Sequence, residues 1–160
     1  CKSPNEPAPA SSEYFPLAVG NKWYYHTNGI SDTSSINVVR EVTGQKSIDN
    51  KTYYEVVSTQ LASGIKDTAF LRMSDKILFA HMGKGENIIA DFSLNLNDKA
   101  YWEKDLKVSK KNGDIMAFES IPQLIDNGYG VTYQKGVGMT YSFLNGFAYE
   151  YTKLVKSEIK

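Results

Sequence analysis

Short apolar segments separated by turn residues at near-regular intervals constrain this chain more than any other feature of its sequence. Glycine, asparagine and aspartate mark the reversals, because they adopt positive φ or bond to their own backbone. The breaks are Asn28–Gly29, Asp49–Asn50, Ser63–Gly64, Gly83–Lys84–Gly85, Asn97–Asp98, Asn112–Gly113, Asn127–Gly128, Gly136 and Asn145–Gly146. Short strands in this rhythm are typical of an antiparallel meander.

The segments between these breaks predict an all-β fold of about ten or eleven strands. We expect strands near 22–28, 34–43, 52–60, 66–73, 75–82, 87–93, 100–108, 114–120, 129–135, 138–144 and 147–157. Only residues 121–126 suggest a helical turn. A sheet of this size rarely stays flat. We therefore predict an antiparallel meander, curved or closed into a lipocalin-like barrel, with a two-sheet β-sandwich as the alternative.

The stretch Tyr14–Tyr25 marks where the fold begins. Gly20–Asn21 supplies a turn, since both residues tolerate positive φ. Trp23 and Tyr25 then fall on one face of the first strand. We expect Trp23 to be mostly buried.

The residues before this stretch predict a tether. Residues 2–13 contain three prolines and no large apolar side chain, so they favour an extended spacer over a packed structure. The sequence thus divides into a tether over 1–13 and a single all-β domain over 14–160. A chain that begins with Cys1 resembles a mature bacterial lipoprotein, in which that cysteine carries the lipid. The alternative is that Cys1 is not the natural start.

Three motifs in order resemble a group of β-rich cell-envelope lipoproteins of Bacteroidetes-type bacteria, largely of unknown function. They are F-P-L-A-V-G-N-K-W-Y-Y at 15–25, I-I-A-D-F-S-L at 88–94 and Y-Q-K-G-V-G-M at 133–139. Ala90 stands where the group often has Tyr, so no role for that Tyr carries over. The resemblance implies an outer-membrane lipoprotein that faces the periplasm or the cell surface.

Composition argues against several function classes. Lys+Arg and Asp+Glu are both 18, and no basic run is long enough to favour nucleic acid. His26 and His81 are the only histidines, so a three-histidine metal site is excluded. No common nucleophile, zinc or phosphate motif occurs. We expect no cofactor, no metal and no enzyme activity.

The aromatic residues suggest a ligand site, although packing in the core and at sheet edges is the plainer interpretation. Tyr25, Trp102, Tyr141 and Glu150 are the candidate ligand-binding residues. The first hypothesis is a binding or interaction module that holds an apolar or amphipathic small molecule in the barrel. The alternative is a structural or accessory subunit of an envelope assembly, with a filled interior and an exposed apolar or aromatic patch.

The last hairpin gives the sharpest expectation. Asn145–Gly146 predicts a two-residue type I′ turn, which would place Tyr141 opposite Glu150. Met139, Tyr141 and Phe143 would then face the interior together with Glu150. The hypothesis makes Tyr141 and Glu150 the polar end of a ligand cup, and the alternative places Glu150 at an open, wetted rim.

Overall fold

The computed structural model describes residues 13–28, 30, 34–120, 128–146 and 148–160. Cys1, the rest of the tether up to residue 12 and the expected helical turn near 121–126 lie outside the described residues.

Eleven strands make up the described fold, close to the predicted positions. They are β1 (Lys22–Thr27), β2 (Val38–Ile48), β3 (Lys51–Gln60), β4 (Lys66–Ser74), β5 (Ile77–His81), β6 (Glu86–Asp91), β7 (Leu106–Asn112), β8 (Ile115–Ser120), β9 (Gly128–Gln134), β10 (Gly138–Asn145) and β11 (Tyr149–Glu158). No described residues form a helix suited to crossing a membrane.

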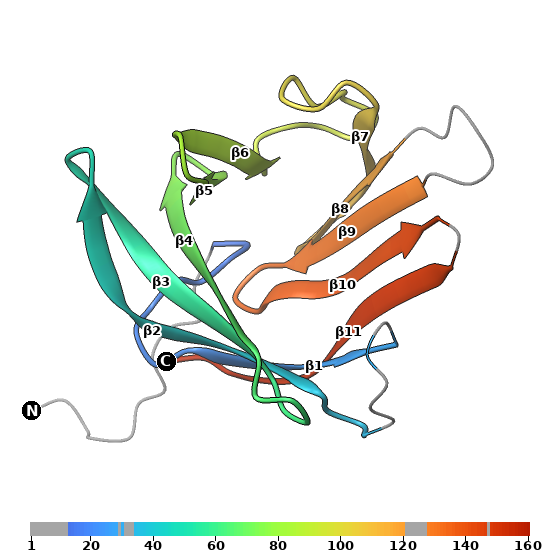
Figure 1. Ribbon diagram of the computed structural model, residues 1–160. Helices are drawn as coiled ribbons and strands as arrows, with labels where there is room; N and C mark the ends of the chain where they lie inside the picture. Colours follow the sequence, from blue (N-terminus) through green and yellow to red (C-terminus); the bar gives the residue numbers. More distant parts are fainter. Residues whose placement is uncertain (1–12, 29, 31–33, 121–127, 147) are drawn as a thin grey trace, which may run out of the picture.

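All eleven strands belong to one antiparallel meander in the order β6-β5-β4-β3-β2-β1-β11-β10-β9-β8-β7. The ladder between β1 and β11 brings the two ends of the chain together. The sheet curls until its edge strands β6 and β7 lie toward the same side (Figure 1). No ladder joins β6 to β7 among the described strands, so the barrel-like sheet is curved but not closed. The all-β meander is confirmed, and the single sheet rules out the sandwich.

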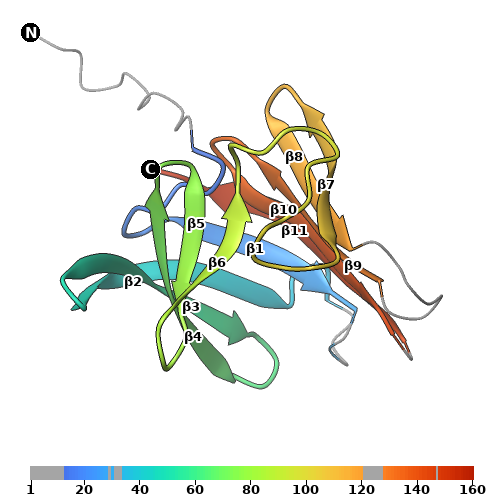
Figure 2. The ribbon, with the colours of Figure 1, turned by 90° about the horizontal axis from the view of Figure 1, so that it is seen from above.

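The connection from β6 to β7 covers the edge that β7 would otherwise expose. Lys99 forms a bridge with Lys107. The Ala100 amide donates to the Leu106 carbonyl at 2.8 Å, and the Val108 amide donates to the Asp98 carbonyl at 2.9 Å. Viewed from above, this connection runs beside β7 (Figure 2). It satisfies backbone groups that a sheet edge leaves unpaired.

The start of the fold closes one end of the barrel. Trp23 and Tyr25 point inward and are both 0% exposed, which confirms the predicted burial. The Trp23 indole Nε1 donates to the Val137 carbonyl at 2.5 Å. Gly138 lies against this ring at φ +106°, where an added Cβ would sit 2.9 Å from Nε1. Phe15 packs on the indole with ring centroids 5.2 Å apart.

The predicted turn in the last hairpin is wrong. Asn145 pairs with Tyr149, so three residues rather than two connect β10 to β11. Tyr141 consequently pairs with Lys153, and Glu150 pairs with Leu144. Both strands are also held on their far sides, β10 by β9 and β11 by β1. These ladders outweigh the local preference of an Asn-Gly dipeptide.

The predicted inner face of β10 is also wrong in part. A register shift between Met139 and Tyr141 leaves Thr140 as an extra residue in the ladder with β9. Such a bulge reverses the alternation of side chains beyond it. Met139 therefore points inward and is buried, whereas Tyr141 and Phe143 lie outside the core cluster.

Candidate functional site

The interior of the barrel changes from buried to half-buried along its length. Near the closed end, inward-facing Trp23 and Val42 are 0% exposed. Toward the other end, three inward apolar side chains pack on the core yet stay half-buried, namely Val38, Val131 and Leu154. Because these side chains point inward, their exposure means that water reaches the interior from that end. We call this region, together with Arg40, the inner cup.

Buried tyrosines form the floor of the inner cup. The Tyr25 hydroxyl donates to the Met139 carbonyl at 3.0 Å. Burial raises the pKa of Tyr25 to about 12, against the opposing influence of the nearby Arg40. Burial likewise raises the pKa of Tyr133. Both phenols are therefore neutral near pH 7, and the floor carries no negative charge of its own.

Arg40 is the charged group beside this floor. It pairs with Trp23 on one side and with Ser58 on the other, so it shares their inward face. Its guanidinium carbon lies 5.3 Å from the centre of the Tyr25 ring. Its Nη1 lies 3.9 Å from the Met139 sulfur, and its buried Nε has no hydrogen-bond partner. No ion pair joins Arg40 to a carboxylate in the described part of the chain.

The rim of the inner cup contains a small hollow of about 140 Å³. It is lined by Thr27, Ser142, Phe143, Leu144, Glu150, Tyr151 and Thr152. Glu150 is exposed there, so the interpretation of this carboxylate as a wetted rim group is confirmed. Leu144 beside it is 54% exposed, which marks this end of the barrel as open.

The four predicted ligand-binding residues do not converge on one site. Tyr25 lies at the floor of the inner cup and Glu150 at its rim. Trp102 is half-buried in the β6–β7 connection, where its ring packs on Phe118 at 6.0 Å. Tyr141 lies on the outer face of the sheet because of the bulge described above.

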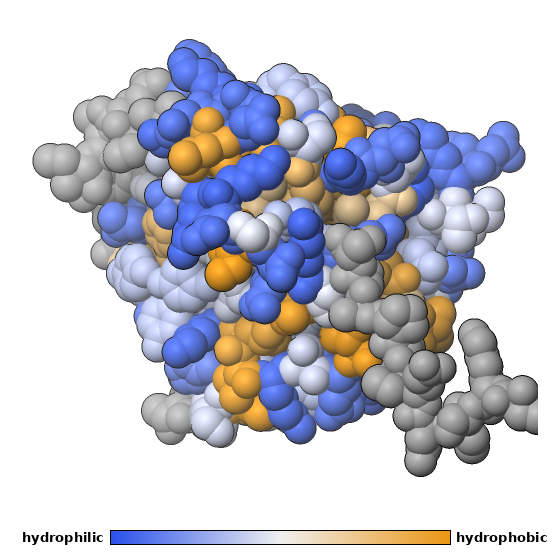
Figure 3. All heavy atoms as spheres, turned by 180° about the vertical axis from the view of Figure 1, so that it is seen from behind, coloured by the Kyte–Doolittle hydropathy of each residue, from blue (hydrophilic) through white to orange (hydrophobic). Residues whose placement is uncertain are grey.

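Tyr141 belongs instead to an outer aromatic cluster, which comprises Tyr141, Phe143, Tyr149 and Tyr151. Neighbouring rings in this cluster lie 6.2 to 6.4 Å apart. The Tyr141 and Tyr149 hydroxyls are 2.6 Å apart, and this hydrogen bond, with burial, raises the pKa of Tyr141 to about 12. Elsewhere, on the face turned away in Figure 1, hydrophobic residues form small groups separated by hydrophilic ones (Figure 3).

A second hollow, which we call the base cavity, lies beyond the closed end of the barrel. It has a volume of about 600 Å³ and is lined by Glu13, Tyr14, Met73, Ser74, Asp75, Lys76, Phe92, Lys111, Gly113 and Lys135. Tyr14 and Phe92 stack at 4.6 Å and give it an aromatic wall. Most of the remaining lining comes from polar residues at hairpin ends, unlike the apolar walls of the inner cup.

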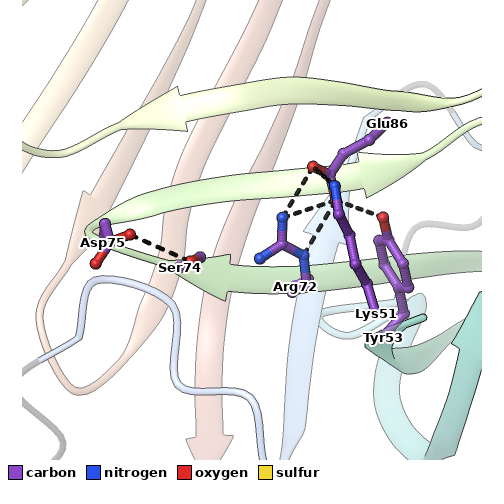
Figure 4. Close-up of polar contacts among 6 residues, drawn as sticks. All are labelled: Lys51, Tyr53, Arg72, Ser74, Asp75 and Glu86. Carbon is purple, nitrogen blue, oxygen red and sulfur yellow. Dashed lines mark hydrogen bonds and ion pairs between the residues drawn. The ribbon is translucent and has the colours of Figure 1, made fainter. Parts of the chain in front are cut away.

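A polar cluster joins β3, β4 and β6 on the outer face of the sheet (Figure 4). The Glu86 carboxylate accepts bonds from Arg72 at 2.8 to 3.0 Å, from Lys51 at 2.9 Å and from the Tyr53 hydroxyl. Burial alone would raise the pKa of Glu86, but these donors hold it at about 2. The Arg72 guanidinium also covers the Phe79 ring at 4.5 Å. Every charge in this cluster is paired, so it stabilises the sheet and offers no free ligand group.

Metal binding has no support from the described residues, since no three His, Cys, Asp or Glu side chains among them gather closely enough to hold an ion.

Sequence reasoning missed Arg40, although a signal for it was present. Val38 and Val42 share a face by alternation, and Arg40 stands between them on that same face. A charged residue in an otherwise apolar alternation points to a buried cation. The Glu86 cluster had no such signal, because Lys51, Arg72 and Glu86 are far apart in the sequence.

Comparison with known proteins supports the fold. No family model and no curated protein matches this sequence. A putative lipoprotein from Parabacteroides distasonis has 12% identity and a TM-score of 0.59, over 92% of this chain and 99% of its own. A putative exported protein with a YmcC-like fold, from Bacteroides fragilis, has 13% identity and a TM-score of 0.57, over the same shares of both chains. The resemblance inferred from the motifs is thus confirmed, and this chain shares the fold of those two proteins.

Proposed function

We propose that the protein is a binding module of the bacterial cell envelope that holds an apolar or amphipathic small molecule in the inner cup. One observation carries this proposal. Val38, Val131 and Leu154 point into the barrel but remain half-buried above a buried aromatic floor. Concave sites with apolar walls and few polar groups are the usual form of small-molecule sites in proteins.

The envelope location is supported by the two structural neighbours, one a putative lipoprotein and the other a putative exported protein. We further propose lipid attachment at Cys1 and insertion of that lipid in the outer membrane. Residues 2–13 would then hold the domain away from the bilayer, because their prolines favour an extended spacer. The role proposed is binding without catalysis.

The outer aromatic cluster favours a second candidate function, that of an accessory subunit in an envelope assembly. Tyr149 is 51% exposed, and it lies beside three further rings on two adjacent strands. Aromatic side chains are enriched where proteins meet partners. In this function the cluster would contact a neighbouring protein while the inner cup stays empty.

The test of the first candidate uses the neutral apolar probe N-phenyl-1-naphthylamine, whose fluorescence rises in apolar surroundings. Leu154→Trp places a larger ring in the inner cup and should reduce probe binding at least about tenfold. Val155→Trp is the matched control, since Val155 is the next residue and is 49% exposed. It should bind the probe as the unaltered protein does.

A third variant distinguishes probe binding in the inner cup from probe binding in the base cavity. Met73→Trp narrows the base cavity, which Met73 lines. Loss of probe binding in this variant, with normal binding in Leu154→Trp, would move the site to the base cavity and refute the proposal. A protein that binds no probe in any form would refute it as well.

A further inference from the structure

We propose that the ligand of the inner cup carries an anionic head group, of the carboxylate or phosphate monoester class, and that Arg40 binds it. This inference rests on the proposed function and names the chemistry of its ligand. The juxtaposition that carries it is a half-buried guanidinium, without an acidic partner, beside the apolar walls of the same cup.

The fold gives the charge of Arg40 no acidic partner among the described residues. The inward-facing carboxylates toward the rim are Asp67 and Glu150, and both are exposed. Neither forms an ion pair with Arg40. The described neighbours of the guanidinium are the Tyr25 side chain, through its ring face and a hydrogen bond, and the Met139 sulfur, and none of them carries a negative charge.

A charge taken out of water is costly unless a partner compensates it, and a buried Nε without an acceptor adds to that cost. The apolar neighbours Val38 and Val42 show that this face otherwise favours hydrophobic side chains. The presence of Arg40 on this face is therefore explained if its guanidinium binds an anionic group of the ligand.

The shape of the donor also favours an anion. A guanidinium presents parallel N–H groups that match two oxygens of a carboxylate or phosphate, and such pairs are among the strongest hydrogen bonds in proteins. The Nε–H of Arg40 is buried without an acceptor, so the outer N–H groups are the ones that would meet the anion first. The neutral hydroxyl of Ser58, on the adjacent strand and the same face, is placed to add polarity at this level.

The geometry also sets the orientation of the ligand. Arg40 lies beside the floor, two residues from Val38 at the start of β2, which is about 7 Å along the strand. On β11 the distance from Leu154 to the rim residue Glu150 is four residues, or about 13 Å. The head group would bind at the bottom and the apolar part would extend toward the rim, over a length that suits a medium-length chain.

The lysines of the base cavity provide a contrast. Of its three lysines, Lys111 donates to the Leu94 carbonyl at 2.5 Å, Lys135 lies 3.9 Å from an Asp114 carboxylate oxygen, and Lys76 follows Asp75 in the chain. Glu13 and Asp75 line the same cavity and offset its positive charge. The base cavity therefore has carboxylates among its lining residues, whereas no ion pair reaches Arg40 in the described part of the chain.

Calorimetric titration of the whole chain with octanoate, octyl phosphate and the neutral octanol tests this inference. The unaltered protein should bind at least one of the two anions about tenfold or more tightly than octanol. Arg40→Met keeps an unbranched stem without the guanidinium and should reduce anion affinity to that of octanol. Arg40→Lys should retain part of the preference, and the outer-face control Lys153→Met should retain all of it.

The outcomes separate this inference from the function on which it rests. If octanol and both anions bind equally, and Arg40→Met changes nothing, the cup binds apolar molecules but the inference is wrong. If none of the three binds, the proposed function fails too. A preference for octanoate or for octyl phosphate identifies which of the two head groups the site takes.

A stability measurement excludes a purely structural role for Arg40. Because its charge has no acidic partner, Arg40→Met should leave the melting temperature unchanged or raise it. A clear fall in melting temperature together with unchanged anion affinity would overturn the inference.

Discussion

Replacement of Trp23 by alanine tests the assignment of the inner face most severely. The indole is 0% exposed, and burial of such a side chain removes roughly 150–250 Å² from water. At about 25 cal/mol per Å² this is worth about 4–6 kcal/mol. Large core truncations cost about 3–5 kcal/mol in practice, because the surroundings partly relax. The variant also leaves the Val137 carbonyl without its indole donor.

Urea unfolding, followed by circular dichroism, should therefore show a free energy of unfolding about 3–5 kcal/mol lower for Trp23→Ala, with an unchanged slope. The melting temperature should fall by about 6–20 °C. Tyr24→Ala is the matched control, since Tyr24 is the next residue and lies outside, 4.2 Å from the Lys156 ammonium. That contact is worth about 0.5–1 kcal/mol. Equal losses for the two variants would refute the inward assignment of Trp23.

Three further predictions concern a glycine, a carboxylate and the N-terminus. Gly138→Ala should lower the free energy of unfolding by about 2–5 kcal/mol in a urea titration, because φ is +106° and the new Cβ meets the Trp23 indole; an unchanged midpoint would contradict this. The pKa of Glu86 is lowered to about 2, so its stabilising contribution is complete above its ordinary pKa and is lost as the pH falls toward 2. The free energy of unfolding of the unaltered protein should thus exceed that of Glu86→Gln above about pH 4.5, and this difference should disappear as the pH falls to about 2. Unfolding at several pH values measures the difference, and a constant value would argue against the cluster. Cys1→Ser should move the protein from the membrane fraction to the soluble fraction of the producing bacterium, and a variant that stays with the membrane would exclude lipid attachment at Cys1.

Turn chemistry and alternation predicted most of the fold. Positive-φ residues such as Asp49, Asn50 and Gly113 stand in the reversals where the sequence placed them. Trp23 and Tyr25 point inward because strict alternation holds through the short strand β1. These are local rules, so the number of strands and the antiparallel meander follow from them.

The predictions for the inner face of β10 and for the last turn were wrong because the ladder there departs from strict alternation. The extra residue Thr140 reverses the faces of β10, and nothing in its neighbourhood distinguishes it from an ordinary strand residue. A bulge responds to the curvature of the whole sheet rather than to a local preference. The same holds for the Asn145–Gly146 turn, where the ladders with β9 and β1 decide the register. Tyr141 was consequently placed on the wrong face.

The candidate site was predictable only in part. Tyr25 and Glu150 were expected on the inner face, and the structure places them at the floor and the rim of the inner cup. The lack of an acidic partner for Arg40 depends on which strands face it across the barrel, which the sequence of β2 does not contain. The face of Arg40 was predictable, whereas its uncompensated charge was not.

A crystal structure of the protein with octanoate bound would show directly whether the inner cup holds the ligand. We expect the hydrocarbon chain between Val38 and Leu154, with the carboxylate within hydrogen-bond distance of Arg40. Octanoate in the base cavity beside Tyr14 and Phe92, or on the outer aromatic cluster, with an empty inner cup, would contradict this expectation.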